Sequence, residues 1–152
     1  MKTIKFRGQT IDNKWVYGDL IQIGGGALIY HGSKQTVEEI PQENSPCAVG
    51  FYSHEISPVK LNTIGQFTGV KDKKEIDIYE GDLIKYEIQE PPTEGFPFGG
   101  DMIDCIHEVI FNESDCKFEL SNKTIPTMNE SLCCCRFMEV IGNVFDNEDL
   151  VF

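Results

Sequence analysis

Positive charge is scarce in this sequence. It contains 13 lysine and arginine residues against 25 aspartate and glutamate residues, which gives a formal net charge of −12 at pH 7. A negative field of this size repels phosphate backbones, so nonspecific duplex binding needs a local basic patch. The only basic cluster comprises Lys71, Lys73 and Lys74, and neighbouring carboxylates offset it. The composition therefore disfavours nucleic acid as the ligand.

Long apolar runs and a recognisable export signal are also lacking. No stretch reaches the ~18 apolar residues from which a transmembrane helix is inferred. The opening Met1–Arg7 has no apolar core of the kind that a signal peptide requires. We therefore expect a cytoplasmic protein with no membrane segment, in which the six cysteines stay reduced.

Cysteine and histidine do not form a recognisable metal or nucleophile motif. Cys133–Cys135 are adjacent, and neighbouring side chains on a helix point about 100° apart, so these three cannot readily close one tetrahedral site. A zinc site would need Cys133 to meet Cys105, Cys116 and His107 in space, and this alternative stays open. A Cys–His nucleophile also stays open, although no family signature surrounds any of the thiols. We expect neither a metal nor a cofactor.

Two further candidate sites, a phosphate-binding loop and a pair of catalytic carboxylates, lack the neighbouring residues that would support them. Gly24–Gly26 resembles a phosphate cradle, but no Lys-Ser/Thr pair and no helical pattern follows it. The glycines are better explained as the turn of a hairpin between Leu20–Ile23 and Ala27–Tyr30. Glu80 and Asp82 are candidate catalytic carboxylates, but capping of a turn explains both. We do not expect an enzyme.

The densest alternation of apolar and polar residues runs from Thr63 to Ile88. It predicts a strand, a turn, a short strand, a corner and a strand. Gly65 and Gly69 indicate a bend or bulge of the kind that closes small barrels, and Asp72 is placed to accept hydrogen bonds from backbone N–H groups downstream. The predicted core residues are Ile76, Ile78 and Leu83 with Ile84, Tyr86 and Ile88, and the predicted corner is Tyr79–Asp82.

The N-terminal part predicts further strands. Ile4–Gly8 and Trp15–Tyr17 form the first pair, and Gly18–Ile21 repeats the Gly81–Ile84 corner letter for letter. We interpret the repeat as the same corner used twice. The polar residues 31–46, with two prolines, predict a loop. The short strands expected after it are Ala48–Tyr52 and Glu55–Val59.

The C-terminal part predicts three strands and one helix. Cys105–Phe111 is apolar on both faces, which is typical of a central or doubly covered strand. Cys116–Leu120 returns beside it with Phe118 and Leu120 inward. A Thr-x-x-Glu capping spacing at Thr127 predicts a short helix over about 128–135. Phe137–Phe145 is the last strand, and the tail after it turns off the sheet.

Three ordered motifs resemble the YopX family of phage and prophage proteins. The first is Lys5–Gly8 with Trp15–Leu20, the second is Thr63–Gly69 with Asp72 and Ile78–Ile84, and the third is Glu139–Phe145. The resemblance implies a mainly β protein that contains an SH3-type small barrel, with additional β-hairpins and at most one short helix. It implies a single domain over 1–152, with an N-terminal β subdomain at about 1–60 and a barrel core at about 61–152. The resemblance implies no activity, because the family has no established catalytic residues to assign to this sequence.

Two functional hypotheses follow. The first is a noncatalytic protein-interaction module encoded by a phage or prophage, in which Trp15, Tyr79, Phe96 and Phe98 engage a host or phage protein. The second is nucleic-acid binding by the barrel through aromatic stacking, which the charge disfavours. Exposed strand edges also make a homo-oligomer an expectation.

Overall fold

The computed structural model describes residues 3–40, 47–89, 101–121, 130–132 and 137–150. These residues are mainly β-strand, and no α-helix occurs among them, which confirms the expected fold class at this level. The chain divides into two compact units, Ile4–Ile64 and Gly65–Phe152, the latter together with the first three residues. We call them the N-terminal and C-terminal units and describe each by itself. In the described residues, no helix has the length and apolar character that crossing a bilayer requires.

The N-terminal unit is an antiparallel sheet with the strand order β4-β3-β2-β1. Its strands are β1 (Phe6–Gln9), β2 (Trp15–Ile23), β3 (Gly26–Ile40) and β4 (Cys47–Val59), followed by the 3-10 turn η1 (Leu61–Thr63). One face of the sheet forms a core of Ala27, Ile29 and Val59, against which Phe6, Val16, Leu20 and Ile64 pack. The predicted hairpin at Gly24–Gly26 is confirmed, because Gly24 and Gly25 adopt φ of 58° and 82° between β2 and β3.

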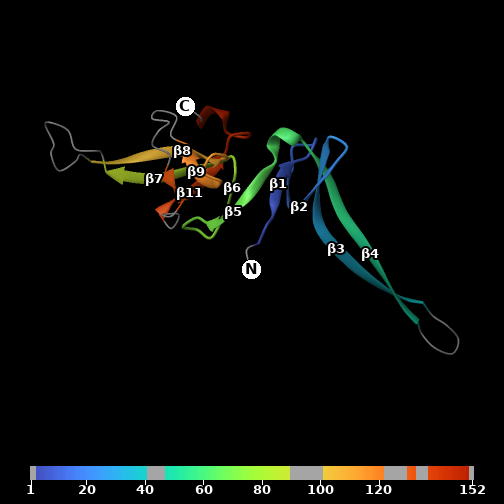
Figure 1. Ribbon diagram of the computed structural model, residues 1–152. Coiled ribbons are helices and arrows are strands. Elements are labelled where there is room, and N and C mark those ends of the chain that lie inside the picture. The colour runs from blue at the N-terminus through green and yellow to red at the C-terminus, as the bar shows by residue number, and fades with distance from the viewer. Residues whose placement is uncertain (1–2, 41–46, 90–100, 122–129, 133–136, 151–152) are drawn as a thin grey trace. The chain divides into compact units, whose positions relative to one another are not determined.

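The long β3–β4 hairpin corrects the loop predicted for residues 31–46. Pairing continues from Ala27↔Val59 to Ile40↔Cys47, so residues 31–40 are strand and the two short strands expected after them are one strand (Figure 1). A bulge between Tyr30 and Gly32, where Gly32 has φ of 124°, lets the ladder continue. A two-stranded ribbon need not bury an apolar face, so its residues can be as polar as those of a loop. Composition alone therefore does not distinguish the two structures. Residues 41–46 lie outside the described residues.

The corner predicted for Gly18–Ile21 is wrong. These four residues lie inside β2, and Asp19 and Leu20 pair with Tyr30 and Ile29 of β3. A Cβ atom at Gly18 would lie 1.9 Å from the Tyr30 carbonyl oxygen. Glycine is required here because the two backbones approach closely, which is a different reason from the need for a turn.

The C-terminal unit contains a five-stranded antiparallel sheet with the order β10-β9-β8-β7-β11. Its strands are β7 (Asp82–Gln89), β8 (Met102–Asn112), β9 (Lys117–Ser121), β10 (Glu130–Ser131) and β11 (Glu139–Asn143). Strands β5 (Gly65–Lys71) and β6 (Asp77–Tyr79) of the same unit pair with each other, and η3 (Glu148–Leu150) follows β11. The predicted order of strand, turn, short strand, corner and strand from Thr63 to Ile88 is therefore confirmed.

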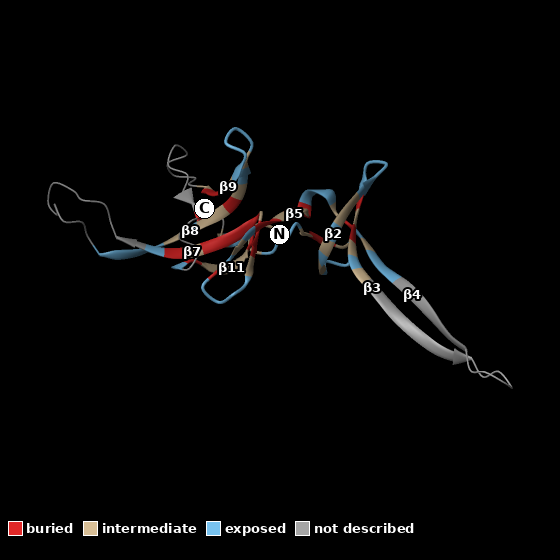
Figure 2. Cartoon of the chain, turned by 60° about the horizontal axis from the view of Figure 1, so that its bottom comes forward, coloured by how far each residue is buried: buried red, intermediate tan, exposed pale blue. Residues whose placement is uncertain are grey.

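The core of this unit lies on one face of the sheet. Buried residues concentrate in β7 and its neighbours (Figure 2), and the cluster comprises Ile78, Ile84, Tyr86, Val109, Leu120, Leu132 and Met138. Ile78, Leu83, Ile84 and Tyr86 are buried as expected. Ile76 is 46% exposed, so its prediction as a core residue is wrong. It lies in the β5–β6 turn, just before the strand alternation begins.

The expectation of a central strand at Cys105–Phe111 is confirmed, and the expectation of a helix is corrected. β8 lies between β7 and β9 and is central, but Ile106 is 39% exposed, so the strand is not covered on both faces. Within the expected helix at 128–135, Glu130 and Ser131 form β10 and pair with Leu120 and Glu119 of β9. Pairing with an open strand edge outweighs a local capping signal at these two residues. Residues 128–129 and 133–135 of that prediction lie outside the described residues.

Candidate binding surface

The four aromatic residues predicted as a binding site do not form one described cluster. Trp15 begins β2, is half-buried, and has the Arg7 guanidinium 4.9 Å from its ring centroid. Tyr79 is only 4% exposed and packs against Phe67, with ring centroids 5.6 Å apart, so the expectation that it is exposed is wrong. It is buried because β6 pairs Tyr79 directly with Phe67 of β5. The other two, Phe96 and Phe98, lie outside the described residues.

An apolar surface that the sequence analysis missed lies on the N-terminal unit. Residues directly opposite each other on paired strands share a sheet face, and so do residues two apart on one strand. By this rule one face of β2, β3 and β4 carries Tyr17, Ile21, Ile23, Leu28, Tyr30, Ile56 and Pro58, together with the exposed carboxylate of Asp19 on β2. It is the face opposite the core of this unit. We call this set the outer face.

Three side chains make the outer face accessible. Ile23 is 66% exposed, Tyr17 is 51% exposed and Ile56 is 47% exposed. At the end of this surface Tyr30 lies beside His54, with ring centroids 5.9 Å apart. The sequence signal was present, because β2 is apolar on both faces while only one face is covered. It was missed because the number of layers on a sheet is not readable from one strand.

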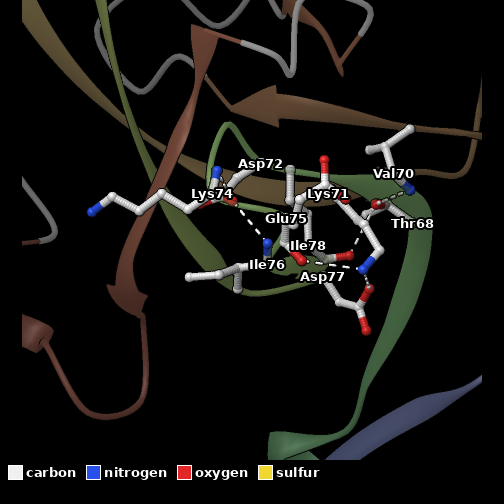
Figure 3. A network of polar contacts seen from close by, with 9 residues as sticks. All are labelled: Thr68, Val70, Lys71, Asp72, Lys74, Glu75, Ile76, Asp77 and Ile78. Carbon is white, nitrogen blue, oxygen red and sulfur yellow. Dashed lines mark hydrogen bonds and ion pairs between the residues drawn. The ribbon is translucent and has the colours of Figure 1, made fainter.

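Asp72 organises the turn between β5 and β6. Its carboxylate is 3% exposed and accepts hydrogen bonds through Oδ1 from the backbone N–H groups of Lys74 at 2.7 Å and Ile76 at 2.9 Å (Figure 3). Its Oδ2 accepts a third from the N–H of Val140 on β11 at 3.1 Å. The predicted local role of Asp72 is confirmed. The bond to β11 adds a tertiary role that ties the turn to the sheet of the same unit.

The basic cluster of the same turn is engaged in ion pairs. Lys73 Nζ lies 2.7 Å from Glu139 Oε2, Lys74 pairs with the other carboxylate oxygen, and Lys71 lies 3.4 Å from Asp77. Hydrogen bonds from Lys73 and Lys74 lower the pKa of Glu139 to about 2, and the pKa of Lys74 is raised by its bond to Glu139. The cluster therefore neutralises carboxylates of its own unit.

This ion-pair group predicts a pH dependence. Because the folded-state pKa of Glu139 lies below its unfolded value of about 4.3, its contribution to stability is present above that value and is lost as the pH falls through about 2. We expect the melting temperature of the C-terminal unit to fall over this acid range, and Glu139→Gln to weaken that dependence. Calorimetric melts across the range measure it, with the exposed Glu113→Gln as control. Equal pH profiles for Glu139→Gln and the unsubstituted protein contradict the assignment.

The candidate metal ligands and nucleophiles are placed as follows. Cys105 is partly buried and Cys116 exposed, neither of them in a disulfide, and His107 Nδ1 lies 2.8 Å from the Ser121 carbonyl oxygen. In the part of the chain that the structure describes, no group of three or more histidine, cysteine, aspartate or glutamate side chains has metal-binding geometry. Cys133–Cys135 lie outside it.

Of the two catalytic candidates at the corner, Asp82 has a structural explanation. Asp82 is 2% exposed, and its Oδ2 accepts the Tyr79 backbone N–H at 2.7 Å. Gly81 has φ of 80° and donates its N–H to the Val109 carbonyl oxygen at 2.8 Å. The predicted corner at Tyr79–Asp82 is confirmed, and Asp82 caps it.

Comparison with known proteins gives the same fold. The crystal structure of protein EF1440 from Enterococcus faecalis matches with a TM-score of 0.52 and 19% sequence identity, covering 100% of each chain. No curated protein sequence matches the chain. The family model for YopX protein matches residues 5–151. That match spans nearly the whole sequence, so the chain belongs to the YopX family.

Proposed function

We propose that this chain is a noncatalytic protein-interaction module, encoded by a phage or prophage and acting in the cytoplasm of the host. In this proposal the outer face of the N-terminal unit binds a host or phage protein. The phage origin rests on the family resemblance. The observation that carries the binding role is the exposure of Ile23 and Ile56 on one face of β2, β3 and β4.

The energetics support a binding role for this face. Each fully buried aliphatic side chain contributes about 1.5–3 kcal/mol relative to its exposed state, so covering two exposed isoleucines supplies a substantial part of a complex's free energy. Contiguous exposed apolar patches of this kind mark interaction sites on soluble proteins. β4 is also the edge strand of its unit, and its backbone offers a partner strand a hydrogen-bonding edge.

The same edge supports a homo-oligomer as one form of the interaction. Two copies of an edge strand can pair antiparallel about a two-fold axis, which makes a self-complementary interface. The proposal therefore includes a second copy of the chain among the proteins that this unit binds.

Nucleic-acid binding by a small barrel is the second candidate. We propose that β5 to β11 are a variant of the SH3-type barrel. Two bonds support closure by attaching the β5–β6 turn to residues at the start of β11, namely Val140 N–H to Asp72 and Lys73 N–H to the Met138 carbonyl oxygen at 3.0 Å. The ion pairs of Lys71, Lys73 and Lys74 weigh against nucleic acid as its ligand.

An affinity capture tests the binding role of the outer face. The tagged protein is incubated with bacterial lysate, with and without nuclease, and recovered proteins are identified by mass spectrometry. We expect a specific protein in both conditions, reduced at least tenfold by Ile23→Ser with Ile56→Ser, because two lost apolar contacts cost roughly 1.4 kcal/mol or more.

A matched variant controls for lost apolar surface. Ile4 and Ile11 belong to the same unit, are 61% and 77% exposed, and lie outside the outer face. Ile4→Ser with Ile11→Ser should leave the recovery unchanged. Equal recovery by both double variants contradicts the proposal, and partners that vanish with nuclease favour the nucleic-acid alternative.

A further inference from the structure

The net negative charge belongs to one part of the chain. Residues 65–152 contain 19 of the 25 acidic residues and 7 of the 13 basic ones, whereas residues 1–64 contain six of each. The outer face of the N-terminal unit therefore belongs to a neutral segment. The whole negative field arises from the C-terminal unit, so a surface there is expected to select its ligand by charge.

The described lysines of the C-terminal unit are already committed to its own carboxylates. Lys71, Lys73 and Lys74 pair as described above, Lys85 Nζ lies 2.7 Å from Asp104 Oδ2, and Lys117 Nζ lies 3.2 Å from Asp115 Oδ2. These five pairs compensate only a minority of the 19 acidic residues. Residues 65–152 contain 12 more acidic than basic residues, so this part of the chain keeps a net negative charge whichever of them are paired.

Part of that excess lies on the β7–β8 sheet face that points away from the core. Glu87 and Asp104 are directly opposite in the register, and both are exposed. Like charges at directly opposed positions of a sheet are destabilising. The ammonium group of Lys85 bonds Asp104 and also interacts electrostatically with Glu87, so these three side chains together keep one net negative charge.

Exposed apolar side chains alternate with these carboxylates. Met102 and Ile106 flank Asp104 on the same face of β8 and are 59% and 39% exposed. The opposite face of β7 and β8 carries Ile84, Tyr86 and Val109 of the core, so Met102 and Ile106 point away from it. Lys85 lies on this face too, directly opposite Ile106. We call Lys85, Glu87, Met102, Asp104 and Ile106 the β7–β8 face.

We propose that the β7–β8 face binds a cationic amphipathic segment of a partner protein, in which arginine or lysine alternates with apolar residues. The basic side chains meet Glu87 and Asp104, and the apolar ones cover Met102 and Ile106. Charge complementarity selects this occupant. A second copy brings the same carboxylates against these, and nucleic acid brings phosphates, so both are repelled.

The test is a binding titration with a defined probe. A fluorescent peptide of about ten residues, alternating arginine and valine, matches the length of β8 and presents one basic and one apolar face as a strand. We expect saturable anisotropy at low salt and weaker binding as salt rises, because exposed charges are screened. Glu87→Gln with Asp104→Asn should weaken the affinity about 5- to 10-fold, since each exposed ion pair contributes up to about 1 kcal/mol.

Matched variants distinguish binding at the β7–β8 face from nonspecific attraction to the net negative charge of the unit. Glu113→Gln with Asp149→Asn removes the same charge from two exposed positions elsewhere in the unit and should change the affinity less than twofold. Met102→Ser with Ile106→Ser, or replacement of valine by serine in the peptide, should also weaken binding several-fold. Equal weakening by both charge variants, or no effect of the apolar changes, overturns the proposal.

Two further outcomes also decide the proposal. Self-association of the protein that Glu87→Gln with Asp104→Asn strengthens identifies a second copy as the occupant and overturns it. Ile23→Ser with Ile56→Ser should leave peptide binding unchanged, because those residues belong to the other unit. Failure of the outer face as a docking surface is therefore distinguishable from failure of the β7–β8 face.

Discussion

Asp72→Ala is expected to destabilise the C-terminal unit by about 3 kcal/mol. The buried carboxylate accepts three backbone N–H groups, those of Lys74, Ile76 and Val140. Hydrogen bonds to charged groups contribute about 1.5–3 kcal/mol each, and local relaxation around the turn recovers part of the summed loss. Denaturant unfolding followed by circular dichroism measures the change. Amide hydrogen exchange should show faster exchange at Val140 in particular.

Asp72→Asn refines this experiment. The amide keeps one acceptor oxygen for Lys74 and Ile76 but presents an NH₂ group to the Val140 N–H, so we expect about half of the loss. Asp149→Asn, at an exposed position of the same unit, should change stability by less than about 0.5 kcal/mol. A loss for Asp72→Ala no larger than that of Asp149→Asn contradicts the assigned role.

Gly18→Ala is expected to destabilise the N-terminal unit by about 3 kcal/mol or more. The added methyl group would lie 1.9 Å from the Tyr30 carbonyl oxygen and 3.2 Å from a methyl group of Ile29. The obstacle is backbone, so it cannot move aside by changing a rotamer, and β2 and β3 must separate. Trp15, the one tryptophan in the sequence, belongs to this unit, so its fluorescence during denaturation reports the loss selectively.

Two other glycines provide matched comparisons. At Gly26 the nearest atom to an added Cβ is the Ile23 carbonyl oxygen at 3.6 Å, an ordinary contact, so Gly26→Ala should cost less than about 1 kcal/mol. At Gly81 the φ of 80° is the obstacle, and Gly81→Ala should cost about 1–2 kcal/mol in the C-terminal unit. If Gly18→Ala and Gly26→Ala have equal effects, the close approach of β2 and β3 is not what requires glycine at position 18.

The Gly-Asp-Leu-Ile sequence occurs twice and adopts two different structures. At Gly81–Ile84 the corner was predicted correctly, because Gly81 takes positive φ and Asp82 bonds the Tyr79 N–H three residues before it. At Gly18–Ile21 the same letters lie inside a strand, because β3 pairs with Asp19–Ile21 and β1 pairs Phe6 with Gly18. The difference comes from a partner strand that the four letters do not encode.

Other features of the protein also follow from local sequence or from composition. Local sequence was enough to predict the strand pattern from Thr63 to Ile88, the Asp72 turn and the glycine hairpin at Gly24–Gly26, and composition gives the negative charge of residues 65–152. These depend on side-chain alternation, on positive φ and on composition, all of which are local or additive.

Which strand faces are covered depends on tertiary packing. The tertiary structure buried Tyr79 against Phe67, left Ile23 and Ile56 exposed, and extended β3 through a segment whose composition is typical of a loop. Each outcome depends on what pairs or packs from a distant part of the chain. The sequence pattern of a strand with two apolar faces is the same whether one face or both are covered. Exposure is therefore a property of the fold rather than of the strand.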